Sequence, residues 1–143
     1  MNPAPRNLRT AFHWMLLASP VFLLTMQPVS AAERITSGKW ESTMVTDGDT
    51  RTITYCISAA EAASINGDSK SGREFAEKKA GGRCAISAYE IKGATVSYTL
   101  VCGTRTITDR TAFHGETSEG TKRVAGEGET VTSTLKSRRV GPC

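Results

Sequence analysis

Histidine is the scarcest chemically active residue in this chain of 143 residues, which contains only two. His114 is the only histidine outside the segment that we expect to be removed, and this number excludes a metal site made of several histidines. A Ser-His-Asp or Cys-His catalytic site would have to use His114, because His13 lies in a segment that we expect to be removed. His114 follows a predicted strand and precedes Gly115, where we expect a simply exposed side chain.

The acidic residues do not replace the missing histidines. Pairs such as Glu74 with Glu77 and Glu127 with Glu129 lie in polar turns or on predicted helix faces. None has the apolar surroundings that raise a carboxyl pKa for acid–base catalysis. We therefore expect no catalytic residue, and an enzyme that uses His114 with a nearby carboxylate ranks last among the functions considered.

The sequence also lacks an apolar run long enough to span a membrane. The run from Ala11 to Thr25 is shorter than the roughly 20 residues that a spanning helix needs. It follows a segment with two arginines and precedes the small residues Val29-Ser30-Ala31-Ala32, which is the order of a secretory signal peptide. We predict removal of residues 1–31, with cleavage after Ala31 or Ala32. The product is then a single domain over residues 32–143, without a membrane span and in the periplasm.

Excess charge is small. Without Arg6 and Arg9, the basic residues outnumber the acidic ones by two, which is a weak basis for binding nucleic acid. Gly126 and Gly128 precede no helix start that could bind phosphate, and Asp47-Gly48-Asp49 lacks the later ligands of a calcium loop. We expect no nucleic acid partner, no cofactor and no metal.

No Cys-x-x-Cys pair occurs, which argues against a thioredoxin-like redox site or a zinc ribbon. The four cysteines are Cys56, Cys84, Cys102 and Cys143. An even number in a small exported domain predicts two disulfides, and three pairings are possible. We favour Cys56–Cys84, which closes a helical insertion, together with Cys102–Cys143. The rival Cys84–Cys102 would join the ends of a hairpin that its turn already restrains.

What the sequence does contain is alternating apolar and polar residues. The most regular stretch, residues 84–102, predicts two strands that fold back at Gly93. On its second strand Val96, Tyr98 and Leu100 share one face, which is typical of a sheet with one dry and one wet side. Further strands are predicted over residues 38–46, 51–57, 104–114, 120–125 and 130–139.

A short helical insertion interrupts these strands. Ser58 and Glu61 form a capping-box pattern, which predicts a helix over residues 59–65. A polar loop over residues 69–72 and a second helix over residues 73–80 follow. The expected fold is mainly β: a curled antiparallel meander or open barrel with this helical insertion and two disulfides.

A curled sheet has a concave face on which aromatic residues can contact a ligand. Trp40, Tyr98 and Phe113 are the residues that we expect to line such a surface. For Trp40, a place in the core beside Tyr55 and Tyr98 is the favoured alternative.

Four short motifs resemble a family of small exported bacterial proteins, domain-of-unknown-function family 3617. They are Gly38-Lys39-Trp40-Glu41, Cys56-Ile57-Ser58 followed by Glu61-Ala62, the Cys84–Cys102 segment with Gly93, and Gly141-Pro142-Cys143. The resemblance implies an envelope protein of Gram-negative bacteria, and it carries over no catalytic residue.

Two functions remain for a disulfide-bonded β domain without a catalytic constellation. The first is a monomeric, non-enzymatic periplasmic binding module for a small apolar ligand or an envelope component. The alternative is an envelope interaction or inhibitor protein, which contacts another protein through an exposed edge or loop such as residues 66–82 or 116–129.

Overall fold

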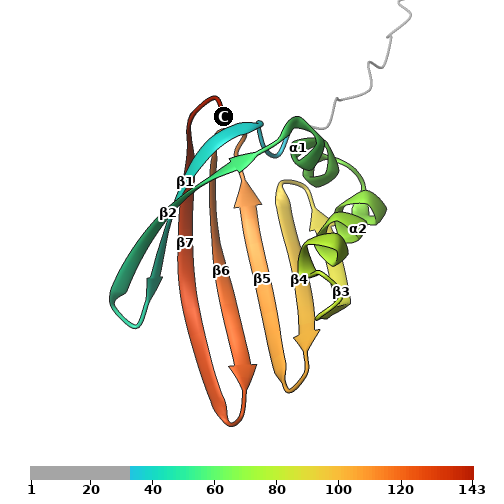
Figure 1. The fold of residues 1–143 in the computed structure, drawn as a ribbon, viewed down its shortest axis with the longest axis vertical. Helices are drawn as coiled ribbons and strands as arrows, with labels where there is room; N and C mark the ends of the chain where they lie inside the picture. Colours follow the sequence, from blue (N-terminus) through green and yellow to red (C-terminus); the bar gives the residue numbers. More distant parts are fainter. Residues whose placement is uncertain (1–32) are drawn as a thin grey trace, which may run out of the picture. The chain divides into compact units, whose positions relative to one another are not determined.

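The computed structural model describes residues 33–143, which form one seven-stranded antiparallel sheet and two helices (Figure 1). The predicted signal peptide lies outside the described residues, and the domain start at residue 32 stays a prediction. The elements in chain order are β1 (Gly38–Thr46), β2 (Asp49–Ile57), α1 (Ala59–Asn66), α2 (Ser69–Ala80), β3 (Ala85–Lys92), β4 (Thr95–Cys102), β5 (Arg105–Phe113), β6 (Thr117–Gly126) and β7 (Glu129–Gly141). Neither helix is long and apolar enough to cross a membrane.

The strand order is β2-β1-β7-β6-β5-β4-β3. Strands β3 to β7 form a meander in which each strand pairs with the next along the chain. The β1–β2 hairpin then docks against β7 rather than β3, so that the first and last strands are neighbours. Because β2 and β3 occupy the two ends of this order, the sheet is open. The predicted mainly β fold, an antiparallel meander that remains open, is confirmed.

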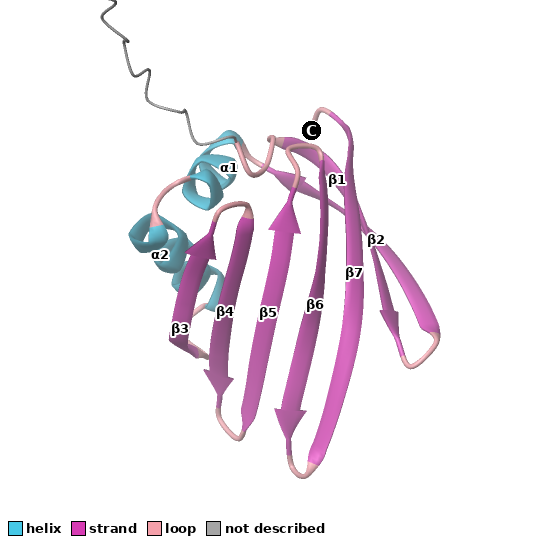
Figure 2. Ribbon diagram, turned by 180° about the vertical axis from the view of Figure 1, so that it is seen from behind, coloured by secondary structure: helices cyan, strands magenta, loops and turns pink. Residues whose placement is uncertain are grey.

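The two faces of the sheet differ in composition. The outer face is rich in threonine, and Thr43 with Thr52 and Thr99 with Thr108 form hydroxyl pairs across neighbouring strands. The inner face carries most of the large apolar side chains, as the alternation along residues 95–102 predicted. Both helices lie on one side of the sheet, near β3 and β4 (Figures 1 and 2). The inner face of the sheet and the two helices therefore enclose a space between them.

Helix α1 begins where the sequence predicted it. The backbone N–H of Glu61 donates to Ser58 Oγ over 3.2 Å, and the backbone N–H of Ser58 donates to Glu61 Oε2 over 2.9 Å. This reciprocal capping box satisfies backbone donors that have no partner within the helix. The helix runs to Asn66, whose side chain bonds in both directions with the backbone of Ile35.

Helix α2 begins earlier than predicted. We expected a polar loop over residues 69–72, but the helix starts at Ser69 because Asp68 caps it. The backbone N–H of Ser71 donates to Asp68 Oδ1 over 2.8 Å. Gly81, in the left-handed conformation with φ 63°, ends the helix, so its last residue is the predicted residue 80.

The disulfide pairing that we favoured from the sequence is wrong. The bonds join Cys56 to Cys143 and Cys84 to Cys102. Cys84 and Cys102 face each other at the open end of the β3–β4 hairpin, with Cα atoms 4.3 Å apart, because Ala85 pairs with Val101. The bond between Cys56 and Cys143 follows from the pairing of β1 with β7. This pairing places the chain after Gly141 beside Lys39, whose partner on β2 is Cys56. Two disulfides are typical of proteins from an oxidising compartment.

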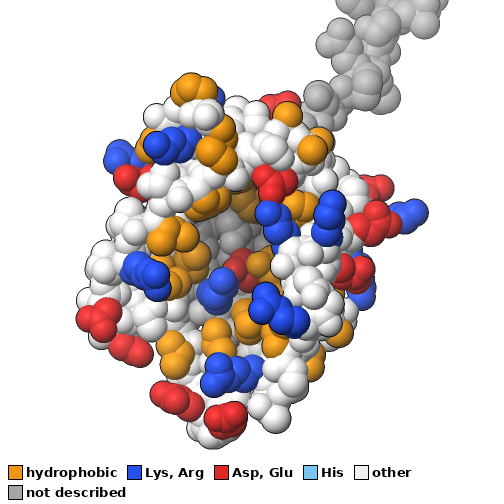
Figure 3. Space-filling view, viewed as in Figure 1, with side chains coloured by type: hydrophobic (Ala, Val, Ile, Leu, Met, Phe, Trp, Pro, Cys, Tyr) orange, Lys and Arg blue, Asp and Glu red, His pale blue; other side chains and the backbone are white. Residues whose placement is uncertain are grey.

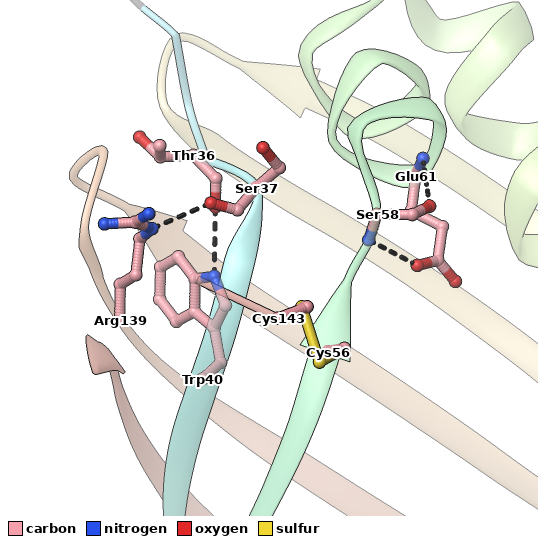
Figure 4. The surroundings of a disulfide bond; sticks show 8 residues. All are labelled: Thr36, Ser37, Trp40, Cys56, Ser58, Glu61, Arg139 and Cys143. Carbon is pink, nitrogen blue, oxygen red and sulfur yellow. Dashed lines mark hydrogen bonds between the residues drawn. A yellow bond between two sulfur atoms is a disulfide. The ribbon is translucent and has the colours of Figure 1, made fainter. Parts of the chain in front are cut away.

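The core lies at the end of the sheet that carries the Cys56–Cys143 disulfide (Figure 4). Trp40 has no exposed surface and packs with Ile35, Ile57 and Ala62. Its indole Nε1 donates to the carbonyl oxygen of Thr36 over 3.0 Å, so the one polar atom of the ring has a partner (Figure 4). This core joins β1, β2 and α1 and supports one end of the space below the helices.

Candidate functional site

A cavity of about 460 Å³ lies between the inner face of the sheet and the two helices. It opens as a hollow on the side of the molecule that carries the helices, and hydrophobic side chains together with several lysine or arginine side chains surround the opening (Figure 3). The volume falls within the roughly 300–1,000 Å³ typical of small-molecule pockets. An unfilled space of this size is much larger than the packing defects of an ordinary core.

Most of the cavity wall is apolar. The helices contribute Ile65, Phe75 and Ala76, and the edge strand β2 contributes Tyr55 and Ile57. The floor is made of alternate residues of the central strands: Val96, Tyr98 and Leu100 from β4, Phe113 from β5 and Leu135 from β7. Because side chains alternate between the two faces of a strand, the lining residues of β4 and β5 are every second residue of those strands.

Gly72 allows the helical wall to approach the sheet closely. A Cβ atom at this position would lie 2.1 Å from the hydroxyl oxygen of Tyr89. The glycine therefore lets the Tyr89 side chain pass directly against α2. Both residues line the cavity.

A row of polar side chains crosses the inner face of the sheet, and its members Asp109, Tyr98 and Tyr89 line the cavity. Cross-strand pairing places its members side by side on the inner face; we call them the polar row. They are Thr46, Ser133, Lys122, Asp109, Tyr98 and Tyr89, from β1, β7, β6, β5, β4 and β3 respectively. Thr46 and Ser133 are joined by a hydroxyl–hydroxyl hydrogen bond of 2.6 Å. The row thus places a charged and hydrogen-bonding strip among apolar residues.

Asp109 is the buried acidic residue of this row, with 7% of its surface exposed, and it lines the cavity. Thr111 Oγ1 donates to its Oδ1 over 2.8 Å. Burial raises the pKa of the carboxyl group above its ordinary value, while the Thr111 hydrogen bond and the charge of Lys122 act in the opposite direction. No ion pair within residues 33–143 includes Asp109.

Tyr98 and Tyr89 stand beside this carboxyl group. Tyr98 is the direct cross-strand partner of both Asp109 and Tyr89. The two rings are stacked, with centroids 6.3 Å apart and planes inclined by 13°. Burial raises the pKa of Tyr98 far above its ordinary value, and the nearby charges of Asp109 and Tyr89 raise it further. The phenol therefore stays neutral and keeps its proton at physiological pH.

The helical side of the cavity holds an ion pair between Lys79 and Glu61. The Lys79 ammonium also lies 5.6 Å from the ring centroid of Phe75. The hydrogen bond from Lys79, followed by the backbone hydrogen bond from Ser58, lowers the pKa of Glu61 to about 2. These two charges therefore compensate each other.

Two of the three aromatic residues expected to contact a ligand, Tyr98 and Phe113, line the cavity. Trp40 does not line it and lies in the adjacent core. Contact with a ligand stays a prediction for all three. Sequence reasoning missed Asp109, although the alternation Ile107-Asp109-Thr111-Phe113 places an acidic residue on the apolar face of its strand.

His114 lies just after β5 and is exposed. Its backbone N–H donates to Thr117 within the turn to β6. Over residues 33–143, no group of three or more histidine, cysteine or acidic side chains is close enough to hold a metal ion. The cavity is therefore the site with the clearest chemical character in the described part of the chain.

Comparison with curated proteins and with solved structures found no match. A family model described as a protein of unknown function, DUF3617, matches residues 31–143. This range includes both disulfides, the cavity and all four motifs that resemble the family. The chain therefore belongs to the DUF3617 family.

Proposed function

We propose that this protein is exported to the periplasm and binds a small, largely apolar ligand without transforming it. The observation that carries the proposal is the cavity of about 460 Å³ whose wall is mainly apolar. Folded proteins fill their interiors to high density, so an open apolar hollow leaves apolar surface in contact with water, which is unfavourable in free energy. A bound apolar ligand would cover that surface. Two disulfides brace the sheet around it.

Periplasmic location is part of this proposal. The two disulfides support an oxidising compartment. The arginine-containing start, the short apolar run and the small residues before residue 32 support a cleaved export signal.

Ala76 provides a direct test, because its side chain lines the cavity from α2. Ala76→Phe adds a ring to the hollow, and we expect at least a tenfold loss of affinity for the fluorescent apolar probe N-phenyl-1-naphthylamine, equivalent to about 1.4 kcal/mol. Ala63→Phe on the exposed side of α1 is the matched control, and its affinity should stay within twofold of the parent. Probe fluorescence measures binding, and circular dichroism verifies that both variants are folded.

Equal affinity for the probe in the parent and in folded Ala76→Phe would contradict binding in this cavity. Absence of any probe binding by the parent would favour the alternative function, contact with another envelope protein. That alternative rests on β2, an edge strand on which Ile53 is 52% exposed. A free edge with exposed apolar residues can pair with a strand of a partner.

A further inference from the structure

We propose that the cavity selects an amphipathic amine, with the ammonium group at Asp109 and the alkyl chain along the apolar wall. This inference rests on the proposed ligand-binding function and specifies its ligand class. It follows from two features of the polar row, a buried carboxyl group with a free oxygen and two adjacent aromatic rings, and from the ion pair that compensates Lys79, the basic residue that lines the cavity.

The carboxyl group of Asp109 has unused hydrogen-bonding capacity. Thr111 donates to Oδ1, and no other side chain of residues 33–143 donates to this carboxyl group. In the same range, no side-chain oxygen or nitrogen that is sealed from solvent lacks a partner. Oδ2 is therefore accessible, and because the residue itself is 93% buried and lines the cavity, access comes from the cavity. A buried carboxylate is best satisfied by a cationic donor.

The aromatic pair favours the same ligand class. Tyr98 and Tyr89 line the cavity next to Asp109. Aromatic ring faces attract cations, and proteins use groups of aromatic rings to bind ammonium ligands. The neutral Tyr98 phenol adds no negative charge of its own, so Asp109 is the anion that fixes the position of the head group.

The other charged residues that line the cavity are Lys79, Glu61 and the exposed Glu119. Lys79 is neutralised by Glu61 on the helical side. Lys122 is the cross-strand neighbour of Asp109 on β6 and does not line the cavity. Its positive charge favours the ionised carboxyl group and also repels a second cation, so the ammonium is held by the oxygen of Asp109 that faces the cavity. Most of the remaining wall is apolar and suits an alkyl chain.

The test compares dodecylamine, dodecanol and dodecanoate, which share one alkyl chain and differ in head group. Each displaces N-phenyl-1-naphthylamine from the parent protein at pH 7, below the concentration at which it forms micelles. We expect dodecylamine to bind at least tenfold more tightly than dodecanol, and dodecanoate to bind more weakly than dodecanol. In Asp109→Asn the amine should lose its advantage, while dodecanol affinity changes less than threefold.

Ser118→Ala is the matched control, since Ser118 also lines the cavity but carries no charge. It should keep the preference for the amine. Equal binding of the three compounds to the parent, or an unchanged amine preference in Asp109→Asn, would overturn the amine inference and leave the apolar cavity function intact. Failure of the probe and of all three compounds to bind would overturn both proposals.

Discussion

The carboxyl group of Glu61 has two partners that both favour its ionised form. One is the N-terminal backbone of α1 through the capping box, and the other is the Lys79 side chain on α2. Together they lower its pKa to about 2, compared with about 4.5 in a solvated glutamate. The residue thus links the start of one helix to the end of the next.

This low pKa predicts an acid-sensitive contribution to stability. A carboxyl group with a depressed folded-state pKa stabilises the fold fully above its unfolded pKa, and this contribution is lost as pH falls from about 4.5 to about 2. We expect Glu61→Gln, which keeps capping ability, to reduce the free energy of unfolding by about 1 kcal/mol at pH 6, because the largely exposed Lys79 is screened. Urea unfolding at pH 6 and pH 2 measures this.

The difference between the parent and Glu61→Gln should shrink toward zero at pH 2. A difference that stays constant between the two pH values would contradict an electrostatic origin, since a lost packing contact does not titrate.

Asp109 illustrates what sequence reasoning could and could not provide at the level of single residues. Its position on the inner face was readable from the alternation along β5. Its chemical significance was not, because the apolar surroundings that raise its pKa come from other strands and from the helices. Tyr98 and Phe113 were identified because large aromatic residues in a strand are conspicuous without tertiary information.

Helix α2 depends on a close approach to β3 that only glycine permits. At Gly72 a Cβ atom would lie 2.1 Å from the Tyr89 hydroxyl and 2.8 Å from its Cζ. Both distances are shorter than side-chain packing allows, so any larger residue moves either the ring or the helix. The Tyr89–Tyr98 stack on the cavity floor would then shift as well.

The substitution Gly72→Ala therefore shows which of two opposing effects on stability is larger, the gain in helix propensity or the loss from overpacking. Propensity alone predicts stabilisation by about 1 kcal/mol, whereas overpacking costs about 1–3 kcal/mol. We expect net destabilisation of about 1 kcal/mol in chemical denaturation. In a Tyr89→Phe background the closest contact is absent, so the same substitution should cost less.

A double-mutant cycle of these two changes gives the coupling energy. Additive effects of Gly72→Ala and Tyr89→Phe would show that the helix does not press on this ring.

The start of α2 also explains one failed sequence prediction. Gly72 suggested a loop, whereas the Asp68 cap and the fit against Tyr89 favour a helix through that position.

At the scale of the whole molecule, the two disulfides close loops of very different length. Cys56 and Cys143 are 87 residues apart, and Cys84 and Cys102 are 18 residues apart. In the chain-entropy model, a bond across the longer loop stabilises by about 4–5 kcal/mol and one across the shorter loop by about 3 kcal/mol. We expect Cys56→Ser/Cys143→Ser to lose more stability than Cys84→Ser/Cys102→Ser, by about 1 kcal/mol, in urea unfolding.

The reverse order of stability would contradict the chain-entropy account and point to local structure at the β3–β4 hairpin. Mass spectrometry of proteolytic fragments under non-reducing conditions verifies the pairing in the parent protein. Each double variant should keep the remaining bond.

Sequence reasoning predicted the meander but not how it closes. Strands β3 to β7 follow one another with short turns, and local patterns are enough to place them. The contact between β1 and β7 joins residues such as Glu41 and Arg138, which are distant in sequence. No local pattern encodes such a contact, and for this reason the disulfide prediction failed with it. The pairing of cysteines followed from the strand order, which only the three-dimensional structure provides.

The position of β7 between β1 and β6 has a consequence for biogenesis. A nascent chain that emerges from its N-terminus presents β1 and later β6 before the strand that joins them exists. Until β7 arrives, two strand edges stay unpaired and the Cys56 thiol lacks its partner. We therefore expect insertion of β7 and formation of the Cys56–Cys143 bond to come late in folding. A chain without β7 has two free strand edges and an unpaired Cys56, and we expect it to aggregate more readily than the complete domain.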